Sequence, residues 1–193
     1  MLALLLLGLG VALGALLAFV VPRPVMPQAI EWLATPRSLT AFRLESDQDV
    51  FTNQSLAGRW TILLFGFMHC PDICPTGLAQ MATLATRLAE HAGESDIAFV
   101  FVSVDPGRDS VVEVGQFARH FDASFHGVTG SEEQLARLAG NLGVQFAVSP
   151  VRGRYTVAHS VTFSIVDPQG NFTGRFRPGF DAGQLAKELS LRF

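Results

Sequence analysis

Cysteine is nearly absent from this chain of 193 residues, which contains only two. Two thiols are too few for a disulfide framework, for a zinc site of four cysteines, or for an iron–sulfur cluster held by cysteine alone. An excess of basic residues is missing as well, because 14 Lys and Arg stand against 17 Asp and Glu. Nucleic-acid-binding proteins normally carry a basic excess or a basic stripe, so the composition excludes nucleic acid as a partner.

Internal repeats are also lacking, and no period of roughly 20–50 residues is visible. The hydrophobic fraction of 49% excludes a low-complexity disordered chain. The length suits one ordinary domain with an appendage and is short for two full domains.

The N-terminal segment Leu2–Val21 contains no polar side chain. A helix of this length spans about 30 Å, which is the thickness of the hydrocarbon layer of a membrane. A cleaved signal peptide would instead show a basic start, a shorter apolar run and a small-x-small cleavage site. We therefore expect residues 1–21 to form an uncleaved transmembrane anchor, residues 22–38 to form a proline-containing tether, and residues 39–193 to form the folded domain.

Charge does not decide the orientation of this anchor. Arg23 and Arg37 follow the segment, and the positive-inside rule would place them in the cytoplasm. The N-terminal flank is a single residue, however, and long domains translocate regardless of charge. The topology therefore stays open at this point.

The rest of the chain alternates between strand and helix patterns. Near-continuous apolar runs predict buried strands, and period-2 alternation predicts further strands, at Leu39–Leu44, Trp60–Phe67, Ile97–Val104, Ser160–Asp167 and Phe172–Phe176. Apolar residues at helical spacing and capping signals predict helices at Pro75–His91, Ser110–Phe121, Ser131–Leu142 and Asp181–Leu191. This order predicts an α/β three-layer sandwich, with a mixed central sheet and helices on both faces. Thioredoxin-like folds have this succession, and flavodoxin-like folds begin in a similar way.

Both cysteines, Cys70 and Cys74, lie in the connection between the first buried strand and the following helix. Thioredoxin-like proteins carry their chemistry at this junction. The start of the helix should favour a thiolate at Cys74, because free N–H groups and the positive end of the helix dipole lie there. The two sulfurs can join as a disulfide or converge on one metal ion. Their spacing is longer than the two intervening residues of a thioredoxin motif and does not match c-type haem attachment.

The five histidines differ in their relation to this pair. His91, His120 and His126 fit solvated or packing positions, and His69 points away from Cys70 if the backbone there is extended. His159 precedes the strand Ser160–Asp167. In a thioredoxin-like arrangement the loop that enters this strand faces the cysteines, where oxidoreductases place a cis-proline. An imidazole at that position favours metal binding, and two thiolates with one imidazole suit Cu(I).

The chain resembles the Sco/SenC family of copper-binding proteins, which take part in cytochrome c oxidase assembly. The resemblance depends on three segments, which are GFMHCPDICP at residues 66–75, VSVDPGRD at residues 102–109, and His159-Ser160. It implies a thioredoxin-like fold with copper, as Cu(I) or Cu(II), bound by Cys70, Cys74 and His159. It also implies an anchor in the inner membrane, with the domain in the periplasm or the mitochondrial intermembrane space.

The function implied by this resemblance is a membrane-anchored copper chaperone. Its partner would be the copper-binding subunit of cytochrome c oxidase or another copper protein. The family commonly has Asp immediately before the ligand histidine, whereas this chain has Ala158, which puts copper affinity or the choice of client in question. The segment Asp105–Asp109 is interpreted as a strand end that leads to a helix capped by Asp109 or Ser110.

Other functions use the same residues. A thiol–disulfide reductase or a redox sensor would use Cys70 and Cys74 as a redox-active pair, and such an activity can coexist with copper binding. Thiol peroxidases usually carry Thr or Ser three residues before the reactive cysteine, where this chain has Pro71 before Cys74. A purely structural tethered domain is the remaining alternative.

Overall fold

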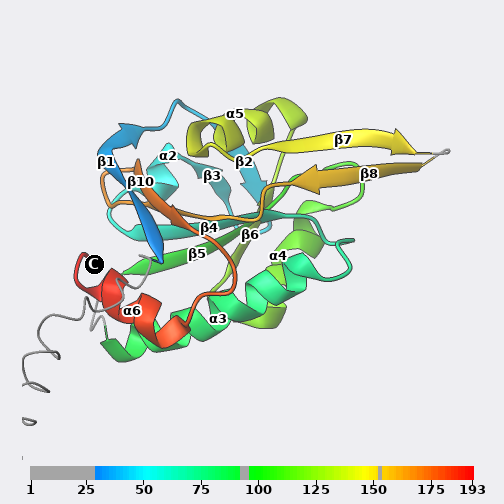
Figure 1. Ribbon diagram of the computed structural model, residues 1–193. Helices are drawn as coiled ribbons and strands as arrows, with labels where there is room; N and C mark the ends of the chain where they lie inside the picture. Colours follow the sequence, from blue (N-terminus) through cyan, green and yellow to red (C-terminus); the bar gives the residue numbers. More distant parts are fainter. Residues whose placement is uncertain (1–28, 92–95, 152–153) are drawn as a thin grey trace, which may run out of the picture.

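The computed structural model of the protein describes residues 29–91, 96–151 and 154–193 (Figure 1). Its strands are β1 Ile30–Ser38, β2 Arg43–Ser46, β3 Val50–Thr52, β4 Trp60–Gly66, β5 Ile97–Ser103, β6 His126–Thr129, β7 Phe146–Val151, β8 Arg154–His159, β9 Phe163–Val166 and β10 Asn171–Phe176. Its helices are α2 Asn53–Leu56, α3 Ile73–His91, α4 Val111–Phe121, α5 Glu132–Leu142 and α6 Ala182–Ser190.

Eight of these strands form one mixed sheet in the order β1-β10-β9-β4-β5-β6-β2-β3. The central strands β4, β5 and β6 are parallel, whereas β9 runs antiparallel to β4, and β10 runs antiparallel to β9. β4 and β5 occupy the two apolar runs that the sequence assigned to buried strands. The expected mixed sheet is thereby confirmed.

Helices cover both faces of this sheet, as predicted for a three-layer sandwich (Figure 1). On β4, Ile62 and Leu64 pack in a cluster with apolar residues of α3, α4 and α6. Leu63 and Phe65 point to the opposite face and pack in a second cluster with α2 and α5. Because adjacent strand residues face opposite sides, a strand covered on both sides must be apolar throughout.

Part of the predicted tether is a strand instead. Residues 30–38 form β1, which pairs with β10 at one end of the sheet. Pro36 suggested an irregular segment, but it lies where the pairing shifts between Trp32 and Arg37, at a sheet edge where a missing N–H is tolerated. Ile30 is buried and packs with the cluster of α3 and α6, which holds the strand in place.

The loop expected before the strand Ser160–Asp167 is also regular. β7 and β8 pair with each other as a separate two-stranded ribbon, with Phe146 opposite His159. In Figure 1 this ribbon extends beyond the sheet. The prediction of a loop was based on Pro150 and Gly153 in the sequence. Residues along β8 instead alternate between buried and exposed, as in a strand, because Val157 is buried and its two neighbours are exposed.

In the described part of the chain, no helix combines the length and the apolarity that a membrane span requires. The anchor predicted at residues 1–21 and the first part of the tether, residues 22–28, lie outside the described residues.

Three segments of this fold meet at one edge of the sheet. Because β4 and β5 are parallel, their carboxyl ends lie side by side, and the N–H of Val104 donates to the carbonyl of Gly66 at 2.9 Å. The base of the β7–β8 ribbon lies at the same edge, as the contact between His159 and Cys74 shows. This edge therefore brings together the residues that the sequence singled out.

Candidate metal centre

Both cysteines lie at the junction of β4 and α3. Cys70 is in the connection, and Cys74 is the second residue of α3. Both side chains are buried, with 8% and 1% of their surface exposed, and both thiols are free. Gly66 makes room for the pair, because a Cβ at this position would lie 2.8 Å from the Cys74 sulfur and 2.7 Å from the ring of Phe101. The end of β4 therefore approaches Cys74 too closely for any other residue.

His159 comes from a distant part of the chain and completes a cluster. It is the last residue of β8, and its Nε2 lies 3.4 Å from the Sγ of Cys74. The ligand atoms of Cys70, Cys74 and His159 all lie within 4.8 Å of one another. The convergence expected from the sequence is present in the structure.

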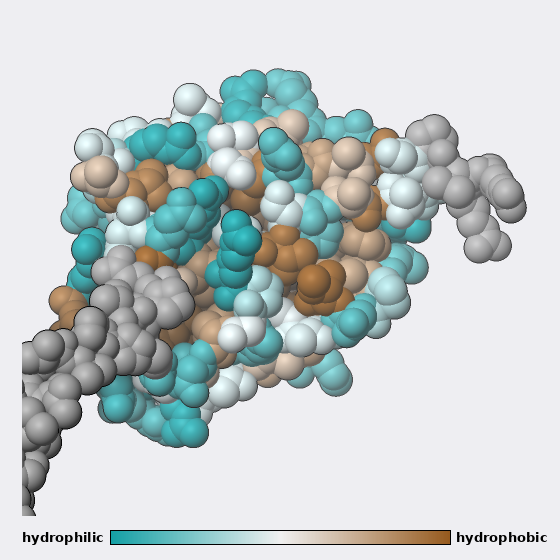
Figure 2. Space-filling view, in the orientation of Figure 1, coloured by the Kyte–Doolittle hydropathy of each residue, from teal (hydrophilic) through white to brown (hydrophobic). Residues whose placement is uncertain are grey.

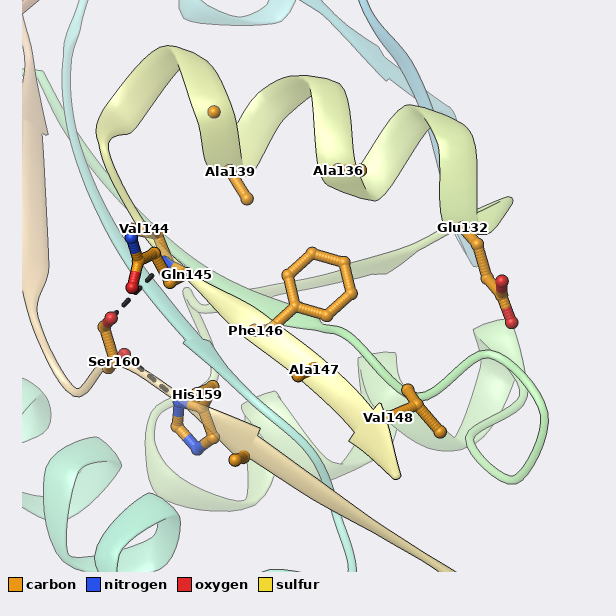
Figure 3. Close-up of a pocket in the computed structure, with 12 residues that line it drawn as sticks. Glu132, Ala136, Ala139, Val144, Gln145, Phe146, Ala147, Val148, His159 and Ser160 are labelled. Carbon is orange, nitrogen blue, oxygen red and sulfur yellow. Dashed lines mark hydrogen bonds between the residues drawn. The ribbon is translucent and has the colours of Figure 1, made fainter. Parts of the chain in front are cut away.

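The hydrogen bond on the far side of the ring fixes the form of His159. Its Nδ1 lies 3.1 Å from the carbonyl oxygen of Ser160. Figure 3 marks this contact with a dashed line. A carbonyl only accepts, so Nδ1 carries the hydrogen and Nε2 presents its lone pair to the sulfurs. Burial lowers the pKa of His159, and the bond to Ser160 opposes this shift. The edge-on ring of Phe67, with centroids 5.8 Å apart, restricts the imidazole further. The ring is therefore neutral and oriented at physiological pH, as a metal ligand requires.

The two thiols differ in acidity, and the thiolate predicted at Cys74 is not the favoured form of that residue. Burial raises the pKa of Cys74 to about 12. Burial also opposes ionisation of Cys70, but hydrogen bonds from the backbone N–H groups of Cys74 and Asp72 outweigh it and lower the pKa of Cys70. The reason is the position of the helix start. Because α3 begins at Ile73, Cys74 lies inside the helix, and the free N–H groups of the first turn point to Cys70.

Asp109 supports the cysteine connection from the side. Its buried carboxylate accepts hydrogen bonds from the N–H of Met68 at 2.8 Å and from the hydroxyl of Ser103 at 2.6 Å. His69 pairs with the same carboxylate through Nδ1 at 3.3 Å and does not belong to the sulfur–imidazole cluster. Of the two predicted caps of α4, Asp109 and Ser110, the structure has Ser110, whose hydroxyl accepts a hydrogen bond from the N–H of Glu113. Asp109 therefore holds the backbone before Cys70 in place by hydrogen bonds, a role that was not predicted from the sequence.

Asp105 makes a similar connection to the ribbon. Its carboxylate accepts from the hydroxyl of Tyr155 on β8 at 2.6 Å and from Nε of Arg108 at 2.5 Å. The Arg108 guanidinium also lies 4.3 Å from the ring centre of Tyr155 and 5.9 Å from that of Phe67. The match to VSVDPGRD was the only sequence signal for these contacts, since side-chain bonds between distant segments leave no periodic pattern.

The remaining histidines lie outside the cluster, in agreement with the prediction. His91 is at the end of α3, where its Nδ1 contacts the carbonyl of Arg87. His120 is exposed on α4, and His126 begins β6. Across the ranges that the structure describes, Cys70, Cys74 and His159 are the one group of His, Cys, Asp and Glu side chains with metal-ligand geometry.

Ala158, at the position where the resemblance implies Asp, lies beside this cluster but is exposed. With Ser160 and Phe146 it lines an open pocket of about 870 Å³. Figure 3 shows Phe146 and Ser160 at this pocket, between the ribbon and α5. Adjacent residues of a strand face opposite sides, so the Cβ of Ala158 points away from the imidazole of His159.

Two sulfurs and one imidazole nitrogen make a donor set for a soft metal ion. Thiolates select ions such as Cu(I), which accepts few ligands, whereas structural zinc sites require four. Fold and site together define a thioredoxin-like protein in which two cysteines and one histidine form a candidate metal site. The SCO1/SenC family model matches residues 34–192, and the chain belongs to this family.

Relatives in sequence agree with this assignment. A protein of Stutzerimonas stutzeri that is described as copper-binding is 35% identical over 161 residues, which cover 81% of this chain and 78% of the relative. The mitochondrial SCO1 homolog 1 of Arabidopsis thaliana is 35% identical over 143 residues, or 74% of this chain. The match spans only 42% of the length of the Arabidopsis protein.

Solved structures of the family have the same fold. Arabidopsis thaliana ScoI with copper bound superposes with a TM-score of 0.72 at 34% identity, covering 79% of this chain and 95% of that one. Yeast Sco1 with copper bound gives a TM-score of 0.74 at 28% identity, covering 81% and 88% of the two chains.

Proposed function

We propose that this chain is a copper chaperone that binds one copper ion through Cys70, Cys74 and His159. The observation that carries the proposal is the convergence of the three ligand atoms within 4.8 Å, with the imidazole already in its metal-binding tautomer. Copper-bound structures of related Sco proteins support copper as the ion. In this proposal copper is the cargo of the protein. Three ligands leave a coordination position free for a ligand from the client.

Delivery would proceed by ligand exchange with a thiolate of the client. A client sulfur bonds to the copper while a bond to Cys74 or His159 breaks, and the copper keeps its oxidation state. A proton returns to Cys74, whose pKa of about 12 favours the thiol once the metal leaves. The high pKa of this thiol therefore helps release.

The surface around the site suits contact with a protein client. Ile73, between the two cysteines, is 45% exposed, and Val112 on α4 is 55% exposed. Figure 2 shows hydrophobic side chains on the face between the ribbon and helices α3 and α4. We propose the copper-binding subunit of cytochrome c oxidase, or another copper protein, as this client.

We also propose that residues 1–21 anchor the chain in the inner membrane, with the domain in the periplasm or an equivalent compartment. An anchor near a membrane-bound client raises the effective concentration of the copper site. Protease protection of the full chain in membrane vesicles tests this topology. Cleavage of the domain in right-side-out vesicles is expected, whereas cleavage only in inverted vesicles would contradict it.

Titration of the full chain with Cu(I) against a chromophoric chelator tests copper binding. One ion per chain is expected, and Cys70→Ser, Cys74→Ser and His159→Ala should each weaken binding at least tenfold. His120→Ala, which removes an exposed histidine outside the site, is the control. Transfer to the purified copper-binding domain of a cytochrome c oxidase subunit should follow, and unchanged affinity in the three variants would overturn the proposal.

The acidity difference between the thiols favours a second function, reduction of client disulfides. Cys70 is the more acidic thiol and would attack the client, and Cys74 would then displace the client sulfur. Two electrons pass from the two thiols to the client disulfide, which leaves as two thiols. Reduction of a client disulfide by the copper-free chain supports this activity, and its loss in Cys70→Ser but not His159→Ala separates it from copper binding.

A further inference from the structure

The metal ligands come from two parts of the fold with no strand pairing between them. The sulfurs belong to the junction of β4 and α3, while His159 belongs to the β7–β8 ribbon, which is a separate sheet. The distance from the imidazole to the sulfurs therefore depends on what holds the ribbon to the body of the domain.

One hydrogen bond connects the ribbon to the body at some distance from the ligands. The hydroxyl of Tyr155 donates to the carboxylate of Asp105 at 2.6 Å. Apart from the contacts of His159 with Cys74 and Ser160, it is the one side-chain hydrogen bond that joins residues 146–149 or 155–159 to another part of the described chain. Tyr155, Val157 and His159 alternate along β8 and share one face, and Val157 is buried against the core. Tyr155 thus fixes the same face of the strand that carries the ligand.

Residues 105–109 form a tight turn that holds both halves of the site. The N–H groups of Arg108 and Asp109 donate to the carbonyl of Asp105 at 3.1 and 2.9 Å. At one end of the turn, Asp105 holds Tyr155, and at the other end Asp109 holds the N–H of Met68 before the cysteines. Both carboxylates are almost fully buried, at 2% and 1% exposed. Five consecutive residues therefore set the position of the ribbon relative to the cysteine connection.

Two further features adapt this turn to Tyr155. Arg108 pairs with Asp105 and stacks on the Tyr155 ring at 4.3 Å, so it balances the buried charge and covers the hydrogen bond. Gly107 lies so close that a Cβ there would approach the Tyr155 hydroxyl to 3.1 Å. A side chain at position 107 would press on the hydroxyl that makes the bond.

We propose that Tyr155, through its bond to Asp105, is a positioning residue for His159 and thereby sets how tightly the site retains copper. This proposal rests on the proposed three-ligand copper site. With the bond intact, the ribbon keeps Nε2 of His159 within reach of both sulfurs. Without it, the ribbon is held near its base and by the packing of Val157, and the imidazole spends more time away from the metal position.

The test is Tyr155→Phe in the full chain, which removes the hydroxyl and keeps the ring under Arg108. Cu(I) affinity is expected to fall about tenfold. This is the lower end of the loss that follows when a residue supporting a metal ligand is replaced. Nitrogen hyperfine coupling in the electron paramagnetic resonance spectrum of the Cu(II) form should weaken as well. Thr173→Val is the matched control, because it removes another buried hydroxyl, which donates to the carbonyl of Ile165 at 3.2 Å between strands β10 and β9 and has no contact with the ribbon.

A double-mutant cycle with His159→Ala separates positioning from a general structural role. If Tyr155 acts through His159, Tyr155→Phe has no effect on affinity once the imidazole is gone. An equal loss in both backgrounds would overturn the proposal, because it would show a structural effect that does not depend on His159. If His159→Ala weakens binding and Tyr155→Phe does not, the positioning role is wrong and the copper site stands. If His159→Ala itself has no effect, the three-ligand site is wrong, and the positioning role falls with it.

Discussion

The Nε2 of His159 lies 3.4 Å from the sulfur of Cys74, although 85 positions separate the two residues in the chain. This contact joins the ribbon to the junction of β4 and α3. It also places a neutral nitrogen beside a thiol that burial keeps protonated, and a metal ion can replace that proton.

Gly66→Ala should damage the site sterically. The added Cβ would lie 2.8 Å from the Cys74 sulfur and 2.7 Å from the Phe101 ring, both inside the packed core. We expect a loss of about 1–3 kcal/mol in the free energy of unfolding, typical of an overpacked core, and weaker copper binding. Denaturant unfolding and copper titration measure both.

Gly140→Ala is the control for that substitution. Gly140 lies in α5, and a Cβ there meets nothing within 4 Å. Alanine should stabilise the helix by up to about 1 kcal/mol and leave copper binding unchanged. If the two variants behaved alike, the close approach of β4 to Cys74 would not matter to the site.

The stability of the metal-free protein should fall on both sides of neutral pH. The folded pKa of His159 is below its ordinary value of 6.5. Its contribution to the free energy of unfolding is therefore complete above pH 6.5 and is lost as the pH falls below this value. The folded pKa of Cys74 is about 12, whereas its ordinary value is 9.0. Its contribution to the free energy of unfolding is therefore complete below pH 9 and is lost as the pH rises toward 12.

Unfolding curves across this range provide the measurement. The wild type should lose stability relative to His159→Ala as the pH falls below 6.5, and relative to Cys74→Ala as it rises above 9. Parallel pH profiles for wild type and variants would show that these groups are not shifted by burial.

Copper binding at pH 7 should release protons from the thiols and none from the imidazole. Cys74 is protonated before binding and contributes about one proton, with a further fraction from Cys70. Calorimetry in two buffers of different ionisation enthalpy counts these protons. Cys74→Ser should lower the count by about one, and His159→Ala should leave it unchanged. A lower count in His159→Ala would mean that the ring is protonated before copper binds.

Ala158→Asp introduces the residue that the resemblance to the Sco/SenC family led us to expect immediately before His159. The side chain is exposed, so the free energy of unfolding should change by less than about 0.5 kcal/mol. A residue that hydrogen-bonds to a metal ligand typically changes metal affinity by roughly 10–100-fold. Because position 158 faces away from the ring of His159, the change in copper affinity should be smaller than this. A gain of tenfold or more in a chelator competition would show that Ala158 itself limits affinity.

Much of the fold was predictable because it depends on local patterns. The apolar runs at Trp60–Phe67 and Ile97–Val104 gave β4 and β5, and the cap at Ser131 gave the start of α5. β1 and the β7–β8 ribbon were missed, because proline and glycine suggested irregular chain where long-range pairing decides the structure.

The site was predictable as a set of residues but not in its details. The cysteine connection and His159 stood out by residue type and by their place in a thioredoxin-like order. The difference in acidity between Cys70 and Cys74 depends on where α3 begins, and the predicted start at Pro75 lies two residues after the observed one, a difference that helix patterns do not resolve. The bonds of Asp105 and Asp109 join distant segments, so no local pattern indicates them.

X-ray absorption at the copper edge of the Cu(I)-loaded full chain tests the central claim most directly, since it counts the donor atoms around the ion. Two sulfurs and one nitrogen are expected, with the nitrogen lost in His159→Ala and one sulfur lost in Cys70→Ser or Cys74→Ser. A first shell of sulfur alone in the wild type, unchanged in His159→Ala, would contradict the account.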